Sequence, residues 1–293
     1  MTIPSILGSS IQSTVVGSDG SIFCATSNST FSVKNGKIQW TFPFAPLYSS
    51  PVLGPTGTLF IGIGYFNVFA LDAMTGDLLW EYAIPDWSVM ALEPTDDNVL
   101  YVSGNALFAL NGSDGTLLWS IPGLVTHSAP AIGADGTLYL ARFGLLVLNP
   151  RTLQEDWLAP EVSVQYSPAA APDGAVVTSS DKLVAVDGSD GTLIWEKVLN
   201  GYLFDIPAIA TDGTIFVGGS SIWAYNGVTG RYLWQPALLL GHSKRLPSAQ
   251  MVQCTLTLVD MYVRSILSLG KSSGLARWVG QIIPSPPSAP MVP

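Results

Sequence analysis

Two histidines are the first residues to consider for catalysis, because imidazole is the side chain whose ordinary pKa best suits acid–base work near neutral pH. The chain has only these two, His127 and His242, and each is followed directly by a serine, Ser128 or Ser243. A serine nucleophile needs a histidine that accepts its proton and a carboxylate that orients the histidine. We interpret both pairs as loop residues and predict no catalytic residue.

The segment GKSSG at residues 270–274 matches the GxSxG nucleophile elbow, and its GKS matches the end of a phosphate-binding loop. Both motifs need a strand that leads into a helix, and Ser265 stands where a phosphate-binding loop needs its first glycine. We therefore interpret this segment as a turn. The two cysteines, Cys24 and Cys254, stand far apart and form no CxxC pair. They predict neither a zinc site nor a disulfide.

Charge and hydropathy limit the classes of protein to which the chain can belong. Its 293 residues include 12 Lys and Arg against 21 Asp and Glu, which gives a formal charge of −9. Because nucleic-acid binding needs clustered Lys and Arg, we predict no nucleic-acid partner. The apolar stretches are short and end at Gly, Asp, Asn or Pro, which indicates buried strands and no membrane span. The N-terminus does not resemble a signal peptide, and the sequence leaves the compartment open, including an extracytoplasmic one if the chain has been trimmed.

An internal repeat defines the elements that must position any site. Seven of the nine tryptophans recur at intervals of 40, 39, 38, 38, 39 and 44 residues. These marker tryptophans are Trp40, Trp80, Trp119, Trp157, Trp195, Trp234 and Trp278. The copy that runs from Ser128 to Trp157 contains four short strand-like stretches. Each repeat is therefore predicted to form four antiparallel strands.

Turn residues recur between the predicted strands. The first hairpin of six repeats holds a pair of residues, mostly of types that accept positive φ, and we expect two-residue loops there. These pairs are Asp19-Gly20, Thr56-Gly57, Asp97-Asn98, Asp135-Gly136, Asp173-Gly174 and Asp212-Gly213. A second turn precedes each marker tryptophan and keeps a glycine in six of the seven repeats. The fourth repeat has Pro150-Arg151-Thr152 in its place.

A period near 40 residues with four strands is typical of a β-propeller blade, because so small a sheet buries both faces only by stacking on neighbours around an axis. We predict an all-β fold, a seven-bladed β-propeller of four-stranded antiparallel blades that forms one domain over residues 1–293. Residues 279–293 are a Pro-rich tail or the start of a further blade. Either the tail completes the sheet at Ile11 to Val16 and closes the ring, or the chain comes from an eight-bladed parent.

Three phrases resemble the PQQ-like propeller repeat: VFALDAMTGDLLW from Val68 to Trp80, LFALNGSDGTLLW from Leu107 to Trp119, and LVAVDGSDGTLIW from Leu183 to Trp195. The resemblance covers nearly the whole chain. The family includes quinoprotein dehydrogenases, the propeller lipoprotein of the bacterial outer-membrane assembly machine, and sensor domains. The chain is closest in character to the non-enzymatic outer-membrane-assembly type. The resemblance implies that the seven marker tryptophans pack between blades.

The family's enzymes hold pyrroloquinoline quinone and calcium at the axis of an eight-bladed ring, so the resemblance implies these cofactors as an alternative. The chain has no adjacent cysteines and only five glutamates: Glu81, Glu93, Glu155, Glu161 and Glu196. A calcium ion needs six or more oxygen ligands, and the sequence offers no local cluster of them. We predict no cofactor and no metal ion.

The segments that link each marker tryptophan to the next strand are expected to approach the axis on one face. Three residues before the strand's proline, or its equivalent, they carry Tyr48, Trp87, His127, Gln165, Phe204 and Lys244, with Tyr166 and Asp205 beside this ring. Such aromatic and polar side chains are suited to a binding site for a ligand or a partner. The alternative is that they only fill gaps between blades.

The missing catalytic constellation favours a non-catalytic propeller that binds a protein or peptide through its axial loop face, as an interaction or scaffold module. Two alternatives stay open. One is a quinoprotein-type oxidoreductase that acts on an alcohol or a sugar. The other is a sensor domain for a small ligand or a glycan.

Overall fold

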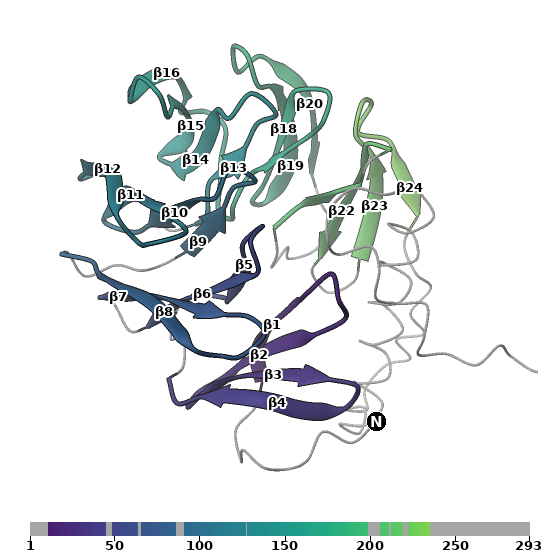
Figure 1. The fold of residues 1–293 in the computed structure, drawn as a ribbon. Helices are drawn as coiled ribbons and strands as arrows, with labels where there is room; N and C mark the ends of the chain where they lie inside the picture. The colour runs from purple at the N-terminus through teal and green to yellow at the C-terminus, as the bar shows by residue number, and fades with distance from the viewer. Residues whose placement is uncertain are drawn as a thin grey trace, which may run out of the picture.

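The computed structural model describes residues 11–44, 49–63, 66–85, 91–126, 128–198, 206–210, 212–218 and 222–234. These residues form six four-stranded sheets, in which consecutive strands pair antiparallel. The first strands of neighbouring sheets lie close together, so the sheets are arranged as blades around a common centre (Figure 1). The fold is the all-β propeller that the repeat predicts. The seventh predicted repeat, with Trp278, and the tail at residues 279–293 lie outside the described residues.

Each described blade contributes four strands, numbered from the centre outwards. The first three blades are β1 (Ile11–Val16), β2 (Ile22–Thr26), β3 (Thr30–Lys34) and β4 (Lys37–Phe42); β5 (Val52–Leu53), β6 (Thr58–Ile63), β7 (Asn67–Asp72) and β8 (Leu78–Ala83); and β9 (Ala91–Pro94), β10 (Val99–Ser103), β11 (Ala106–Asn111) and β12 (Leu117–Pro122). The next three are β13 (Ala131–Ile132), β14 (Leu138–Arg142), β15 (Gly144–Asn149) and β16 (Gln154–Ala159); β17 (Ala169–Ala170), β18 (Ala175–Ser179), β19 (Lys182–Asp187) and β20 (Leu193–Val198); and β21 (Ala208–Ile209), β22 (Thr214–Gly218), β23 (Ile222–Asn226) and β24 (Tyr232–Trp234).

The first turn of each described blade lies where the sequence places it, but its type differs from the prediction. In the first blade, Gly20 N–H donates to the carbonyl oxygen of Gly17, and Gly17 N–H donates to that of Ser21. The loop therefore has three residues, and only its last residue has positive φ, 82° at Gly20. The same bonds recur in the other five described blades. The expected two-residue loop is wrong, because a type I turn followed by one left-handed residue also suits an Asp-Gly pair.

The second turn follows a longer pattern in most blades. In the second blade, Gly76 N–H donates to the carbonyl oxygen of Asp72, and Gly76 has a φ of 79°. The fourth blade has no glycine here, and Leu153 takes the same left-handed conformation with a φ of 58°. The first blade differs again, because its Asn35-Gly36 pair forms a two-residue turn between Lys34 and Lys37.

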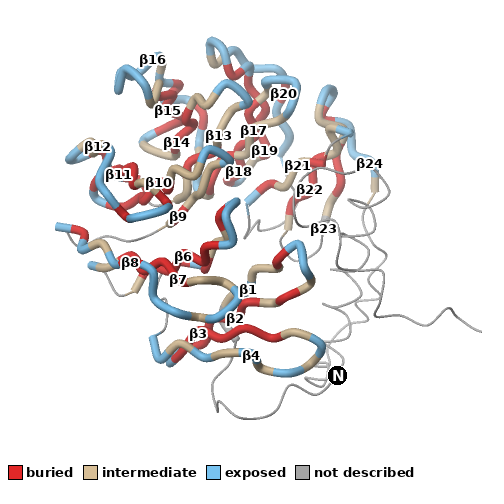
Figure 2. The backbone as a smooth tube through the Cα atoms, in the orientation of Figure 1, coloured by how far each residue is buried: buried red, intermediate tan, exposed pale blue. Residues whose placement is uncertain are grey.

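The core lies between blades. The cluster between the second and third blades joins Phe60, Val68 and Trp80 to Leu100 and Phe108, all of them buried. Similar clusters join each described pair of neighbouring blades. Figure 2 shows the burial concentrated on the second and third strands of the blades, while the innermost strands are mostly intermediate and the turns and outer strands are mostly exposed. This is the stacking that a four-stranded sheet needs.

Two features hold the marker tryptophans between blades: a hydrogen bond from the indole N–H group, and a glycine of the next blade that leaves room for the ring. The indole N–H groups of Trp40, Trp80 and Trp195 donate to the carbonyl oxygens of Ala73, Gly112 and Gly227, which belong to the second turn of the next blade. The glycine of that turn lies against the ring. A Cβ at Gly76 would stand 2.6 Å from Trp40, and one at Gly191 would stand 2.9 Å from Trp157. Trp119 and Trp234 are half-buried in the same register.

A register shift accompanies the tryptophan in every described blade. In the second blade, Ala70 pairs with Trp80 and Leu71 pairs with Leu78, so Leu79 is an extra residue in the outer strand. This β-bulge turns both Leu78 and Leu79 toward solvent while Trp80 stays buried. The two apolar residues before the tryptophan are likewise exposed in the third, fifth and sixth blades, although the sequence gives them the same character as core residues.

Candidate functional site

The links between blades and the turns between second and third strands lie at one end of the molecule, because neighbouring strands run in opposite directions. We call this end the loop face. Around the fourth blade its described parts are residues 123–126 and 128–130 before the blade, the turn at residues 142–144, and the link at residues 160–168 after it.

The structure describes two of the eight residues predicted to form the axial site, Gln165 and Tyr166. The backbone N–H of Gln165 donates to the carbonyl oxygen of Ser179 at 3.1 Å, which holds the link on the fifth blade, and its side chain is exposed. Tyr166 is half-buried. The remaining predicted residues lie outside the described residues: Tyr48, Trp87, His127, Phe204, Asp205 and Lys244. The ring that they would form stays a prediction.

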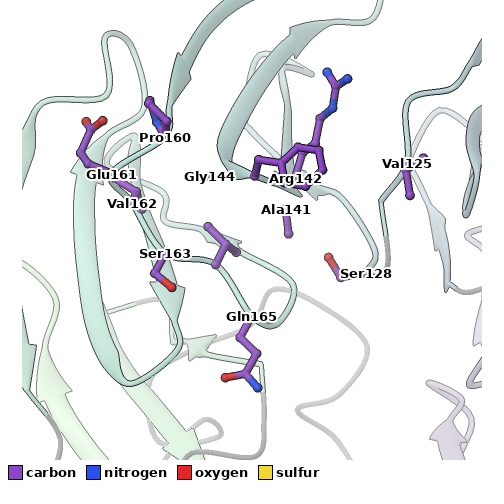
Figure 3. A pocket seen from close by; sticks show the side chains of 12 residues that line it. Val125, Ser128, Ala141, Arg142, Gly144, Pro160, Glu161, Val162, Ser163 and Gln165 are labelled. Carbon is purple, nitrogen blue, oxygen red and sulfur yellow. The ribbon is translucent and has the colours of Figure 1, made fainter.

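A hollow of about 440 Å³ lies on the loop face beside Gln165 (Figure 3). Three segments enclose it: the link before the fourth blade, the turn at residues 142–144 and the link at residues 160–165. Val125, Ala141, Val162 and Val164 supply apolar lining. Its volume lies in the range of small-ligand and side-chain pockets, which runs from roughly 300 to 1,000 Å³.

One polar group in this hollow lacks a partner. The hydroxyl oxygen of Ser128 is shielded from solvent and has no hydrogen-bond partner among the described residues, and Figure 3 shows it turned toward the hollow. Ser49 occupies the corresponding place in the second blade, where its hydroxyl accepts a hydrogen bond from Gly62 N–H at 3.2 Å. A shielded hydroxyl without a partner is costly, so a ligand that donates or accepts a hydrogen bond at Ser128 gains affinity.

Phe143 stands at the rim of the hollow and is 89% exposed. An exposed aromatic side chain in a turn between two strands does not contribute to the core of the fold. Aromatic residues are common anchors of protein interfaces. Phe143 is not among the predicted site residues, because the predicted site draws only on the links between blades and Phe143 lies in the turn between two strands of one blade. The signal that would have found it is an aromatic residue directly before Gly144, in the turn where the third blade has Asn105 and the fifth has Asp181; the second blade also has an exposed aromatic residue in this turn, Phe66.

Another hollow, lined by several aspartates, lies at the opposite end of the fourth and fifth blades. Its volume of about 630 Å³ is larger than that of the hollow on the loop face. The carboxylates of Asp135 and Asp187 in this hollow accept hydrogen bonds within their own turns: Asp135 from Thr137 N–H, and Asp187 from the hydroxyl and N–H of Ser189. These hydrogen bonds lower the pKa values of both aspartates. Among the described residues, no three Asp, Glu, His or Cys side chains come together in a way that could hold a metal ion.

Glu93 is a titratable group at the centre of the propeller. It lies on β9, the innermost strand of the third blade, opposite Tyr101. Burial raises the pKa of its carboxyl to about 7. Glu93 lies two residues before the first turn of its blade. The other described blades have apolar residues at this position: Val15, Val52, Ala131, Ala169 and Ala208. Glu93 is therefore the one acidic residue at this position in the described blades.

No helix in the described part of the chain is long and apolar enough to cross a membrane. The sequence matches the family described as outer membrane protein assembly factor BamB over residues 28–167 and again over residues 154–289. No curated protein matches it significantly.

Two solved structures show the likeness of the fold. The crystal structure of BamB from Moraxella catarrhalis is 18% identical, with a TM-score of 0.60 over 73% of this chain and 72% of that chain. The crystal structure of the RRP9 WD40 repeats is 13% identical, with a TM-score of 0.63 over 78% of this chain and 80% of that chain. At these identities the comparison concerns the arrangement of blades, since folds of this kind serve many functions.

Proposed function

The chain belongs to the family described as outer membrane protein assembly factor BamB, and we propose that it is a non-catalytic interaction module that binds a protein partner on its loop face. The observation that carries this proposal is the pairing of a protruding Phe143 with the hollow beside Gln165. A partner can bury the phenyl ring and insert a side chain of its own into the hollow, which is how interface anchors gain their affinity. The family description makes proteins of outer-membrane assembly the first partners to test.

The proposal is tested by placing a photo-crosslinking amino acid at position 143 in the full chain. We expect a discrete crosslinked partner from this position. The matched control is position 74, because Met74 is 85% exposed on a turn at the opposite end of the second blade. We expect no discrete product there.

Phe143→Ser should then abolish capture of that partner, whereas Met74→Ser should leave it unchanged. Neither change removes a buried side chain, so both variants should fold. Capture that survives Phe143→Ser, or is lost equally in Met74→Ser, would reject the loop face around the fourth blade as the binding site. The predicted pair Tyr48 and Trp87, changed together to Ala, tests the rest of the loop face in the same assay.

A further inference from the structure

We infer that the loop face between the fourth and fifth blades binds an extended segment of a partner in which an apolar side chain is followed closely by a lysine or an arginine. This inference rests on the proposed function and specifies the chemistry of its partner. It is carried by two hollows that share one wall and by the charges around them.

The shared wall is the link at residues 161–163. On one side lies the hollow with Ser128 and Val125, and on the other side lies a second hollow of about 410 Å³ that reaches Asp181 and Lys182 at the start of the fifth blade's third strand. Both hollows are lined by Glu161, Val162 and Ser163. A peptide in extended conformation directs side chains i and i+2 to the same side, roughly 7 Å apart. One segment that crosses the link can therefore place a side chain in each hollow.

The first hollow suits an apolar side chain. Valine and alanine side chains line it, and Phe143 at its rim can cover an inserted aliphatic or aromatic group. The hydroxyl of Ser128 can make one hydrogen bond to an inserted group, and the polar side chains of Ser163 and Gln165 line the same hollow. A backbone N–H or C=O group of an entering peptide satisfies it, and every peptide segment carries both groups.

The second hollow suits a cation. Two basic side chains border the two hollows, and each is already paired: Arg142 with Glu155 at 3.1 Å, and Lys182 with Glu196 at 3.1 Å. Glu161 and Asp181 lie at the same site, and no basic side chain of the described residues is within ion-pair distance of either. The site therefore has two surplus negative charges, which attract a basic side chain and repel an acidic one.

The test uses four capped pentapeptides that differ at two positions. The reference peptide is Ac-Gly-Leu-Gly-Lys-Gly-amide; the others replace leucine with serine, lysine with glutamate, or both. Binding to the full chain is followed by amide chemical shifts in NMR titrations, which measure weak affinities. We expect the reference peptide to bind at least about fivefold more tightly than each singly changed peptide, which corresponds to roughly 1 kcal/mol.

Variants of the chain then separate the two contributions. The double change Glu161→Gln and Asp181→Asn should erase the preference for lysine over glutamate and keep the preference for leucine over serine. Phe143→Ser should weaken the preference for leucine and keep that for lysine. Asp156→Asn, at an exposed position outside both hollows, is the matched control for removing a charge and should change neither preference.

Two outcomes overturn the inference. Either the four peptides bind equally or not at all, or the preferences survive unchanged in the double variant. If the preferences are absent while Phe143→Ser still abolishes partner capture, this inference fails and the proposed function stands. If the preferences are present while partner capture is insensitive to Phe143→Ser, the peptide site exists and the proposed function is at fault.

Discussion

Among the described residues, Leu153 is the one whose backbone conformation fits its side chain least well. Its φ of 58° is left-handed, and glycine holds the equivalent place in the second, third, fifth and sixth blades. A residue with a Cβ pays about 1 to 2 kcal/mol in this conformation, whereas glycine adds a smaller entropy cost in the unfolded chain. We expect Leu153→Gly to raise the free energy of unfolding by about 0.5 to 1 kcal/mol, measured by urea denaturation.

The reverse change at a matched turn supplies the control. Gly191 has a φ of 78°, and a Cβ there would stand 2.9 Å from the Trp157 ring. Gly191→Ala should therefore lower the free energy of unfolding, by more than Leu153→Gly raises it. A destabilised Leu153→Gly variant would show that the leucine side chain contributes more through packing than its backbone conformation costs.

Glu93 gives the stability of the protein a dependence on pH. The pKa of its carboxyl is about 7 in the folded protein against an ordinary 4.5, because burial disfavours the charged form. Between these pH values the folded state keeps a proton that the unfolded state releases. The contribution of the neutral Glu93 carboxyl to the free energy of unfolding is therefore fully present below pH 4.5. As the pH rises to about 7, the free energy of unfolding falls by on the order of 3 kcal/mol.

We expect Glu93→Gln to remove this dependence, since the amide is neutral at every pH. Urea denaturation at pH 8 should find the variant more stable than the wild type, and the difference should shrink toward pH 5. A variant whose stability falls with pH as steeply as that of the wild type would assign the dependence to another group.

At the scale of the blade, the sequence predicted the four strands and the turns between them, because Asp-Gly pairs and apolar stretches act locally. It did not predict the three-residue first turn, since the same residue pair suits both loop lengths. Nor did it predict that Leu78 and Leu79 are exposed. Their exposure follows from the bulge beside Trp80, and a bulge depends on how two strands pair, which local sequence does not state.

The interface between blades predicts a large effect for a buried tryptophan. Trp195 is 8% exposed, and its indole N–H donates to the Gly227 carbonyl oxygen at 2.7 Å. Trp195→Ala should lower the free energy of unfolding by about 3 to 5 kcal/mol, because it leaves a cavity and an unpaired carbonyl. Ile194→Ala changes the exposed neighbour and should cost about 0.5 kcal/mol or less. Equal losses in thermal or urea denaturation would contradict the placement of the indole.

At the scale of the whole molecule, the recurrence of tryptophan was sufficient to predict the propeller, because only stacked blades bury such short sheets. The candidate site was predicted in part. Gln165 followed from the expected convergence of the links, whereas Phe143 borders the hollow from the turn between the second and third strands, and Glu161 precedes Gln165 on the same link. The turn at Phe143 and this link lie side by side because β15 pairs with β16, with Leu145 opposite Ala159, and the spacing of the repeats does not state that pairing.

The arrangement of inner strands also bears on whether the propeller binds a quinone and calcium at its axis. Calcium takes six to eight oxygen ligands, several of them carboxylates. Two residues before the first turn, the innermost strands of the six described blades carry one carboxyl between them, that of Glu93, and burial favours its neutral form. We expect that pyrroloquinoline quinone with calcium leaves the melting temperature of the full chain unchanged and supports no dye reduction with alcohols or sugars. A melting temperature that rises with both added together and falls back in Glu93→Gln would show that residues around the axis complete a calcium site, and would make an oxidoreductase the better description of this protein.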